Sequence, residues 1–368
     1  MGCVRKLRNI GVDVQKTSEH AHVENYVLQE QRKTTGLNRM DGSVNVLSYI
    51  AFAVIIICIW YFTEVMKAKY NMYKVKPEGF EDTKTPENVE DPSSYTWINK
   101  LENIYDEFYV DIYDELLGQS QRTQAKVDLC INIWKSKEPI STWSVLDAGC
   151  GTGIAACYFA KKGAGNVIAL DNSTFMITYA QHETPKKLQL TDKELGNIRW
   201  RQDSVINPSA CSAAEATHLV VFYFTFYYIQ NQEEFLRHLN FWSKPGAKLA
   251  LEVVNKYKFD PILETASPFI GFSLQKYSKE RIRKSSIAFD TFDYQAEFVL
   301  SGDKGEFYET FRFKKKKEKV RRQKHNLFMP EIKKIVKMAE TAGWNYKGYQ
   351  DLNPLGFEYG YLLFLEKN

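Results

Sequence analysis

The feature that most constrains this chain is a glycine-rich run between an apolar strand and a helix-forming segment. Residues 145–146 suit a buried parallel strand, and Gly149, Gly151 and Gly153 follow. Glycine lets the backbone turn sharply and approach a ligand without a Cβ in the way. Helix-forming residues continue over 154–162, so the turn lies at a helix N-terminus, whose free N–H groups favour a carboxylate or phosphate. The run predicts an α/β fold with a ligand site at the end of its first strand.

A second apolar run, residues 167–170, ends in Asp171. A carboxylate at the end of the neighbouring parallel strand can accept hydrogen bonds from both hydroxyls of a ribose. The dinucleotide fingerprint needs a glycine at the position of Ile154. Asp147 also stands where it would repel a pyrophosphate. We therefore expect a ribose-containing ligand with a cationic end, and a nucleotide-dependent oxidoreductase is disfavoured.

Residues 147–153 resemble the first motif of the class I S-adenosylmethionine-dependent methyltransferases. Residues 171–176 are similar to the second motif, in which the acid holds the ribose and the methionine packs on the adenine. Residues 198–204 resemble the third, in which the acid faces the adenine amino group. The resemblance covers residues 95–368 and implies S-adenosylmethionine as the cofactor. The residues that it implies in cofactor binding are Asp147, Ala148, Gly149, Cys150, Gly151, Thr152, Gly153, Asp171, Asn172, Ser173, Met176, Asp203, Ser204 and Phe222.

The same resemblance implies a doubly wound, Rossmann-like α/β fold with seven strands, the last of them antiparallel. The fourth strand and its substrate-facing end are expected at 219–229, and the final two strands, at 344–350 and 358–365, as an antiparallel pair. Residues 256–328 are an insertion, whose alternating pattern around Gly302 predicts an antiparallel β-hairpin. In similar methyltransferases an insertion here covers the active site and selects the substrate.

The implied reaction is an in-line displacement, in which a nucleophile attacks the methyl carbon of a sulfonium. Catalysis then comes from holding the two reactants together and excluding water. Aromatic side chains suit a cationic sulfur, so the run 222–228 could line the site or belong to the core. The aromatic segment 98–117 either closes over the cofactor or packs on the sheet as an amphipathic helix. No general base can be named. The candidates for substrate contact are Tyr109, Tyr113, Phe224 and Tyr227.

An uncharged apolar segment near the N-terminus, residues 42–63, is the second strong signal. A helix of this length rises about 30 Å, which matches the hydrocarbon core of a bilayer. We expect a polar arm over 1–41, a single transmembrane helix over 42–66, a linker over 67–94 and the methyltransferase domain over 95–368. The alternative is a buried core helix. The flank after the span carries Lys67, Lys69, Lys74 and Lys76, and the flank before it carries Arg32, Lys33 and Arg39. This small excess after the span predicts a cytosolic catalytic domain.

The composition of the chain limits the kinds of partner and ligand that we expect it to bind. The formal charge of +4 is too small to indicate nucleic-acid binding. The six cysteines are scattered and form no Cys-x-x-Cys pair, so neither a disulfide framework nor a metal site is expected. A basic run over 314–324 is either a solvated strand end or a contact for anionic head groups. We expect a small molecule or a lipid as the methyl acceptor. The alternatives are a protein side chain and a catalytically silent cofactor-binding scaffold at the membrane.

Overall fold

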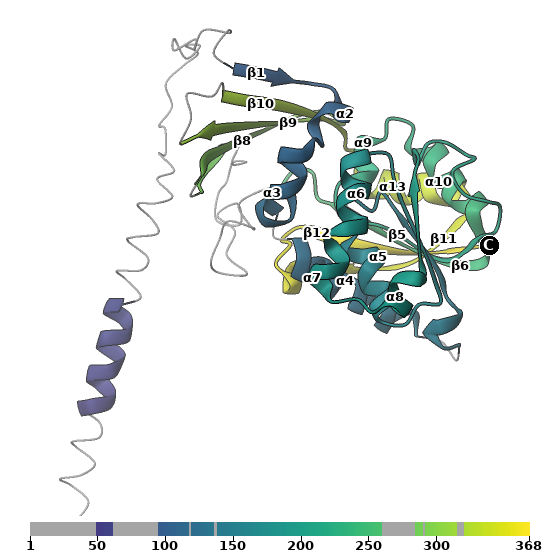
Figure 1. Ribbon diagram of the computed structural model, residues 1–368, viewed down its shortest axis with the longest axis horizontal. Helices are drawn as coiled ribbons and strands as arrows, with labels where there is room; N and C mark the ends of the chain where they lie inside the picture. Colours follow the sequence, from purple (N-terminus) through teal and green to yellow (C-terminus); the bar gives the residue numbers. More distant parts are fainter. Residues whose placement is uncertain are drawn as a thin grey trace, which may run out of the picture. The chain divides into compact units, whose positions relative to one another are not determined.

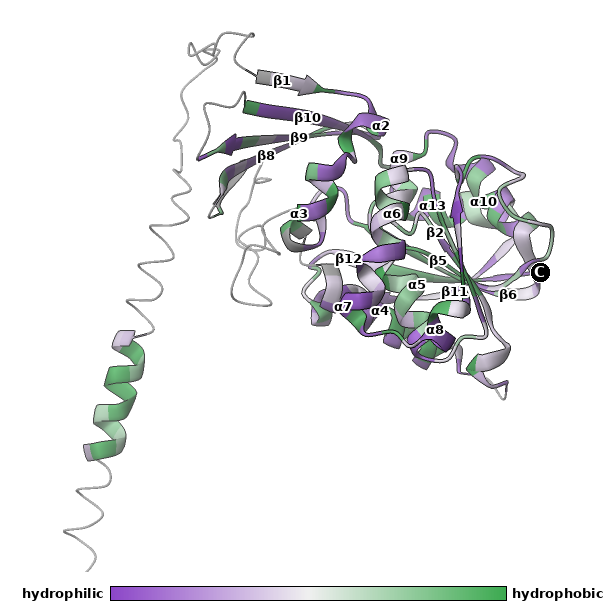
Figure 2. Cartoon of the chain, viewed as in Figure 1, coloured by the Kyte–Doolittle hydropathy of each residue, from purple (hydrophilic) through white to green (hydrophobic). Residues whose placement is uncertain are grey.

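The chain separates into two compact units, Met1–Lys74 and Val75–Asn368. The computed structural model describes residues 49–61, 95–117, 119–135, 138–259, 284–289, 291–314 and 320–368. In the first unit, residues 49–61 form an apolar helix (Figure 2). No helix in the described ranges combines the length and the apolar character needed to cross a membrane. The rest of the expected transmembrane segment, the polar arm and the whole of the linker lie outside the described residues.

A seven-stranded mixed sheet forms the centre of the second unit (Figure 1). Its order is β11-β12-β6-β5-β2-β3-β4, and β12 runs antiparallel to both of its neighbours while the other pairs are parallel. This is the predicted Rossmann-like arrangement with its closing antiparallel pair. The strands are β2 (Ser144–Ala148), β3 (Asn166–Asp171), β4 (Ile198–Gln202), β5 (Ala216–Val221), β6 (Ser243–Val254), β11 (Trp344–Asp351) and β12 (Gly360–Lys367).

The strand order also locates a crevice. β2 pairs with β3 on one side and with β5 on the other, so the chain winds away from β2 in both directions. In open α/β sheets, ligands bind at such a switch point, outside the carboxyl ends of the strands. The glycine-rich turn follows β2 directly and therefore lies at this point.

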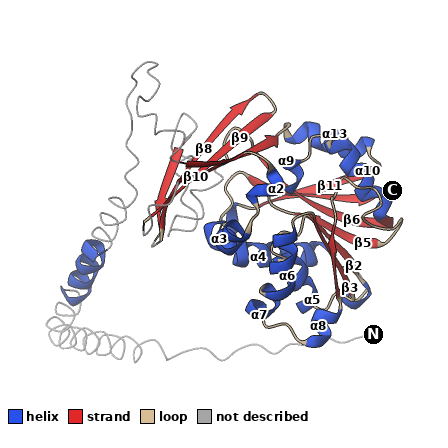
Figure 3. Ribbon diagram, turned by 45° about the horizontal axis from the view of Figure 1, so that its top comes forward, coloured by secondary structure: helices blue, strands red, loops and turns tan. Residues whose placement is uncertain are grey.

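Helices cover both faces of this sheet (Figure 3). Successive side chains of a strand point to opposite faces, and β2 shows the consequence. Val145 packs in one apolar cluster with residues of α4 and α5, whereas Leu146 packs in another with residues of α10 and α13. The helices of the second unit are α2 (Leu101–Ile104), α3 (Glu107–Leu117), α4 (Gln119–Trp134), α5 (Ile154–Lys161), α6 (Thr174–His182), α7 (Thr184–Leu188), α8 (Asp192–Gly196), α9 (Thr225–Tyr228), α10 (Gln232–Trp242) and α13 (Ile332–Thr341).

The insertion belongs to a separate five-stranded sheet, in the order β1-β10-β9-β8-β7. β8 and β9 are antiparallel neighbours with Ser301 opposite Lys304 across a two-residue turn, and Gly302 there has a φ of +61°. The sequence pattern did not indicate the other three strands, of which β1 comes from just before α2. Residues 260–283 of the insertion lie outside the described ranges. The strands are β1 (Tyr95–Ile98), β7 (Lys284–Ala288), β8 (Phe292–Ser301), β9 (Lys304–Phe313) and β10 (Val320–Phe328).

The expected aromatic helix over 98–117 is divided into α2 and α3, with Tyr105 between them. Phe108 of α3 packs against Phe311 of β9, with ring centroids 5.5 Å apart. On its other side, the Thr152 hydroxyl of the glycine turn donates to Asp114 of α3 at 2.7 Å. The segment thus contacts both the inserted sheet and the glycine turn.

Candidate active site

The glycine turn after β2 is packed on two sides and open on the third. Gly149, Gly151 and Gly153 all adopt positive φ, of 79°, 53° and 78°, a region that side chains disfavour. A Cβ on Gly149 would collide with Thr225, and one on Gly153 would lie 2.7 Å from the Cβ of Ala180. A Cβ on Gly151 would meet nothing within 4 Å. The backbone of Gly151 is therefore the part of the turn that a ligand can approach.

Asp171 at the end of β3 lies against this open glycine. The Gly151 N–H donates to one carboxylate oxygen at 2.9 Å, and the Ser173 N–H donates to the other at 3.0 Å. Burial raises the pKa of Asp171, and the backbone hydrogen bonds from Ser173, Gly151 and Asn172 oppose that rise. A carboxylate has about four acceptor positions, so Asp171 can still accept hydrogen bonds from a ligand.

Asp147 has a different role from Asp171. It is buried and accepts the Ala156 N–H of α5 at 3.1 Å. Burial raises the pKa of Asp147 to about 7. The Asp147 side chain therefore ties the end of β2 to the first turn of α5 across the glycine turn.

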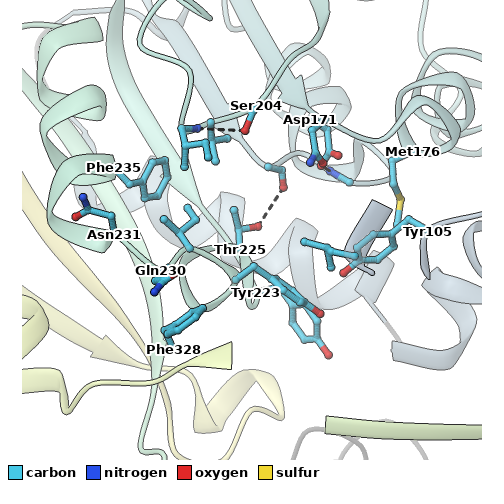
Figure 4. Close-up of a pocket in the computed structure, with 18 of the residues that line it drawn as sticks. Tyr105, Asp171, Met176, Ser204, Tyr223, Thr225, Gln230, Asn231, Phe235 and Phe328 are labelled. Carbon is cyan, nitrogen blue, oxygen red and sulfur yellow. Dashed lines mark hydrogen bonds between the residues drawn. The ribbon is translucent and has the colours of Figure 1, made fainter. Parts of the chain in front are cut away.

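A cavity of ≈ 680 Å³ opens at the crevice, within the range of about 300–1,000 Å³ typical of small-molecule sites. Of the predicted cofactor residues, those that line it are Gly149, Gly151, Asp171, Asn172, Met176 and Ser204. In Figure 4, Asp171, Met176 and Tyr105 lie to one side of Thr225, and Gln230, Asn231 and Phe235 lie to the other. The cavity therefore extends well beyond the turn, toward the segment after β5.

Other predicted cofactor residues lie outside this cavity. Asp147, Cys150, Thr152 and Phe222 line a smaller neighbouring space of ≈ 60 Å³. The Asp203 carboxylate accepts hydrogen bonds from the Ser204 N–H at 2.7 Å and from the Asn207 amide at 3.0 Å, and it is not among the lining residues. Ala148, Gly153 and Ser173 also do not line the cavity. Ala148 ends β2, Gly153 precedes α5 and Ser173 precedes α6.

The four predicted substrate residues separate in the same way. Tyr113 lines the large cavity. Tyr109 and Phe224 line a small adjoining space of ≈ 20 Å³. The Tyr227 hydroxyl accepts the Val254 N–H at 2.8 Å, so Tyr227 is a buried contact between α9 and β6. The large cavity instead has three further tyrosines, and together with Tyr113 they form what we call the tyrosine wall: Tyr105, Tyr113, Tyr223 and Tyr228.

A buried ion pair, absent from the sequence predictions, positions one member of the tyrosine wall. Tyr223 has a φ of +53°, and its N–H donates to the Glu252 carboxylate at 2.6 Å. The same carboxylate is 2.8 Å from the Lys126 ammonium, with side chains 0% (Lys126) and 4% (Glu252) exposed. In the sequence, the only indication of this pair is Glu252, a glutamate within the apolar run that forms β6. The pair holds Tyr223 in a strained conformation.

The sequence of this chain matches a known protein family and parts of several known proteins. Residues 103–296, more than half of the chain, match the family model described as a methyltransferase domain. A probable protein arginine N-methyltransferase 3 of Oryza sativa subsp. indica is 33% identical over 125 residues, which are 33% of this chain and 20% of that protein. Protein arginine N-methyltransferase 1 of Dictyostelium discoideum is 28% identical over 127 residues, which are 34% of this chain and 36% of that protein. The chain thus spans about a fifth to a third of the length of these two relatives.

Two solved structures share the fold at low identity. An S-adenosylmethionine-dependent methyltransferase from Clostridium acetobutylicum has a TM-score of 0.52 and 15% identity, over 71% of this chain and 98% of that one. The CcbJ methyltransferase from Streptomyces caelestis has a TM-score of 0.51 and 13% identity, over 72% of this chain and 97% of that one.

Proposed function

This chain belongs to the methyltransferase-domain family and uses S-adenosylmethionine, and on that premise we propose that it methylates a small-molecule or lipid acceptor held at the tyrosine wall. The observation that carries the proposal is the contact between the Gly151 N–H and the Asp171 carboxylate on the wall of the large cavity. It joins an open backbone to an acid with free acceptor positions, next to a tyrosine-lined space.

The residues around the cavity fit the cofactor by chemistry. Asp171 would accept the ribose hydroxyls, and Met176 and Val205 offer apolar surface to the adenine. Asp203 would act on the adenine edge through the backbone of Ser204, because Ser204 and Asn207 already occupy its carboxylate. When bound, the cofactor supplies a methyl group on a positively charged sulfur. The chain's own residues bind it, orient it and exclude water.

The acceptor end of the cavity favours a neutral molecule. Its tyrosine wall offers aromatic faces, which stabilise a cationic sulfonium. Among the described lining residues the acids are Asp171 and Glu234, and Glu234 is exposed and bonded to Asn231. A cationic acceptor would need a carboxylate to offset its charge, which leaves Glu234 alone for that role.

The names of the curated relatives favour a second candidate, an arginine side chain of a protein. This candidate places the guanidinium near Glu234, at the exposed end of the cavity. With this candidate the transferred methyl group is found on a protein after turnover, whereas with the first candidate it is found on a small molecule or a lipid.

The full chain, incubated with tritium-labelled S-adenosylmethionine, tests both candidates. A membrane lipid extract, a small-molecule extract and an arginine-rich peptide are offered in parallel, and label in a solvent-soluble product supports the first candidate. Label in the peptide alone would replace it with the second. Asp171→Ala should abolish transfer, whereas Asp192→Ala, at an exposed aspartate of α8, should not.

Calorimetry with S-adenosylhomocysteine completes the test. Absence of binding would refute the cofactor site itself. Binding with no label in any of the three pools would refute methyl transfer and leave a scaffold.

We also propose that residues 42–63 anchor the chain in a membrane, with the catalytic unit on the cytosolic side. The described part of this segment supports the proposal, because large apolar side chains over 49–61 are exposed. A basic residue at the centre of a membrane helix costs about 2.5–3.5 kcal/mol. Ile56→Lys should therefore reduce flotation of the full chain with phosphatidylcholine vesicles, and Ile56→Leu should not. Failure of the unmodified chain to float would refute the anchor, and protection of the catalytic unit from added protease in sealed microsomes would refute the orientation.

A further inference from the structure

A buried carboxylate in the inserted sheet collects hydrogen bonds from several directions. Glu309 of β9 is 1% exposed. One of its oxygens accepts from the Tyr294 hydroxyl at 2.6 Å. The other accepts from the Tyr109 hydroxyl at 2.9 Å and the Gln323 amide at 2.5 Å, and it lies 2.6 Å from His325 Nε2. Burial acts to raise the pKa of Glu309, whereas the contact with His325 and the hydrogen bonds from Tyr294 and Gln323 lower it. Hydrogen bonds donated to a carboxylate favour its ionised form, and Glu309 accepts them on both oxygens.

The network around Glu309 is fixed from behind by Arg321. The Arg321 guanidinium donates to the Gln323 carbonyl oxygen at 2.9 Å, which turns the amide nitrogen of Gln323 toward Glu309. Arg321 is held in turn by the Asp106 carboxylate at 2.6 Å and the Ile104 carbonyl at 2.9 Å. The sequence placed Arg321 in a basic run at a solvated strand end or a lipid surface, and for this residue that was wrong: it is 8% exposed.

His325 of β10 connects Glu309 to the large cavity. Because an ionised carboxylate only accepts hydrogen bonds, His325 Nε2 carries a proton toward Glu309. His325 Nδ1 lies 2.8 Å from the Tyr228 hydroxyl, and Tyr228 is part of the tyrosine wall. A continuous hydrogen-bonded path therefore runs from the cavity to a buried anion. Its order of phenol, imidazole and carboxylate is that of a base oriented by a third group.

We infer that Tyr228, His325 and Glu309 form a proton relay that accepts the proton of a hydroxyl acceptor during methyl transfer. This inference rests on the proposed function and names its acceptor class. An alcohol or phenol must lose its proton as the new bond forms, since its product would otherwise be an oxonium ion, whereas a neutral amine can attack with its free lone pair. A relay that ends on a buried carboxylate can take up this proton, and it therefore favours a hydroxyl acceptor over an amine.

The step balances without a further reactant. The acceptor oxygen forms a bond to the methyl carbon, the bond from that carbon to sulfur breaks, and its electron pair stays on sulfur as a neutral thioether. The acceptor proton moves to the Tyr228 oxygen while Tyr228 gives its own proton to His325 Nδ1. The resulting imidazolium lies against the Glu309 carboxylate. Tyr228 is the catalytic residue, and His325 and Glu309 act through it.

The remaining groups that face His325 are neutral. The rings of Tyr105 and Tyr109 from the α2–α3 segment and of Phe307 from β9 lie within 6.5 Å of the imidazole. Burial raises the pKa of both tyrosines well above the usual value, so they keep their protons. Glu309 is thus the charged group in direct contact with His325, and Arg321 acts on the path only through Gln323.

The proton state of His325 is the first test. In the full chain with ¹⁵N-labelled histidine and bound S-adenosylhomocysteine, NMR should show a proton on Nε2 and none on Nδ1, the tautomer that the contacts with Glu309 and Tyr228 require. Tyr228→Phe should shift the Nδ1 resonance. The matched control is Tyr308→Phe, because Tyr308 adjoins Glu309 in β9 but bonds to Glu306 instead. A proton found on Nδ1 in this complex would overturn the relay, since Nδ1 could not then accept one from Tyr228.

Methyl transfer to defined probes is the second test, with catechol and a fatty alcohol as hydroxyl probes and an alkylamine beside them. A lost general base costs about 10²–10⁴-fold in rate, so Tyr228→Phe and His325→Gln should slow hydroxyl methylation by that factor. Their affinity for S-adenosylhomocysteine should be unchanged, which also shows that they fold. Tyr308→Phe should behave as wild type.

Three outcomes would overturn the relay: equal rates in wild type and Tyr228→Phe, label in the amine alone, or no label in either hydroxyl probe while S-adenosylhomocysteine binds. None of these outcomes contradicts the proposed S-adenosylmethionine site. Loss of S-adenosylhomocysteine binding by the wild-type chain would instead remove the proposed function itself.

Discussion

Replacing Lys126 by methionine should destabilise the catalytic unit far more than the same change at Lys162. Both lysines form close ion pairs, Lys126 with Glu252 at 2.8 Å and Lys162 with Asp128 at 2.7 Å. The two pairs differ in burial: the side chains are 0% and 4% exposed in the first, and 38% and 42% exposed in the second. The comparison therefore isolates the effect of burial on one chemical change.

The magnitudes follow from what each substitution leaves behind. Lys126→Met leaves the Glu252 carboxylate buried without its cation, which costs about 3–5 kcal/mol. Lys162→Met removes an exposed pair worth about 0–1 kcal/mol. For a domain of this size, 1 kcal/mol shifts the melting temperature by about 2–4 °C. We expect a loss of roughly 6–20 °C for the first variant and at most about 4 °C for the second.

Thermal unfolding of the full chain, followed by circular dichroism, measures both shifts. Combining Lys126→Met with Glu252→Gln should recover much of the loss, because the neutral amide keeps an acceptor for the Tyr223 N–H and removes the buried charge. Equal melting temperatures for Lys126→Met and Lys162→Met would refute the reasoning. So would a double variant that is less stable than Lys126→Met alone.

Further predictions concern the glycine turn. The folded-state pKa of Asp147 is about 7, above the unfolded value of about 4, so the folded state holds more protons between these values. Its contribution to stability is therefore lost as pH rises through this window, and Asp147→Asn should flatten that decline in urea unfolding across pH. A steeper decline in the variant would contradict this. Gly153→Ala should cost about 1–3 kcal/mol in urea unfolding, because the new methyl meets Ala180 and the backbone is strained. Gly151→Ala should lower stability less but weaken S-adenosylhomocysteine binding in calorimetry, and unchanged affinity would argue against a ligand at Gly151.

The parts of the fold that local pattern encodes could be predicted from the sequence. The turn at 149–153 and the acid at 171 are joined by one helix and one strand, and parallel pairing of β2 with β3 brings them together. The seven-stranded sheet and its closing antiparallel pair were implied by the resemblance to the methyltransferase family and are confirmed by the strand order. The motif assigns the Asp203 carboxylate to the adenine, whereas local pattern does not indicate that the Asn207 amide, four residues later, donates to this carboxylate.

The inserted sheet shows why the rest could not be predicted. Alternation in β9 and β10 indicates which side chains share a face, but it does not indicate what that face meets. His325 contacts Tyr228 from 97 positions away, and the packing of β10 against α9 creates that contact. A lone histidine and a lone glutamate in alternating strands look the same whether they are exposed or buried. The parallel pairing of β1 with β10 likewise joins segments that no local pattern connects.

The division of the chain between its two sheets has a consequence for how such a protein can diversify. The glycine turn, Asp171 and Met176 come from one continuous stretch, and β8, β9 and β10 come from another. Exchange of the later stretch for a different sequence would alter the surroundings of the incoming nucleophile without touching the earlier one. A lineage could acquire new acceptors in this way while every descendant kept the same methyl donor.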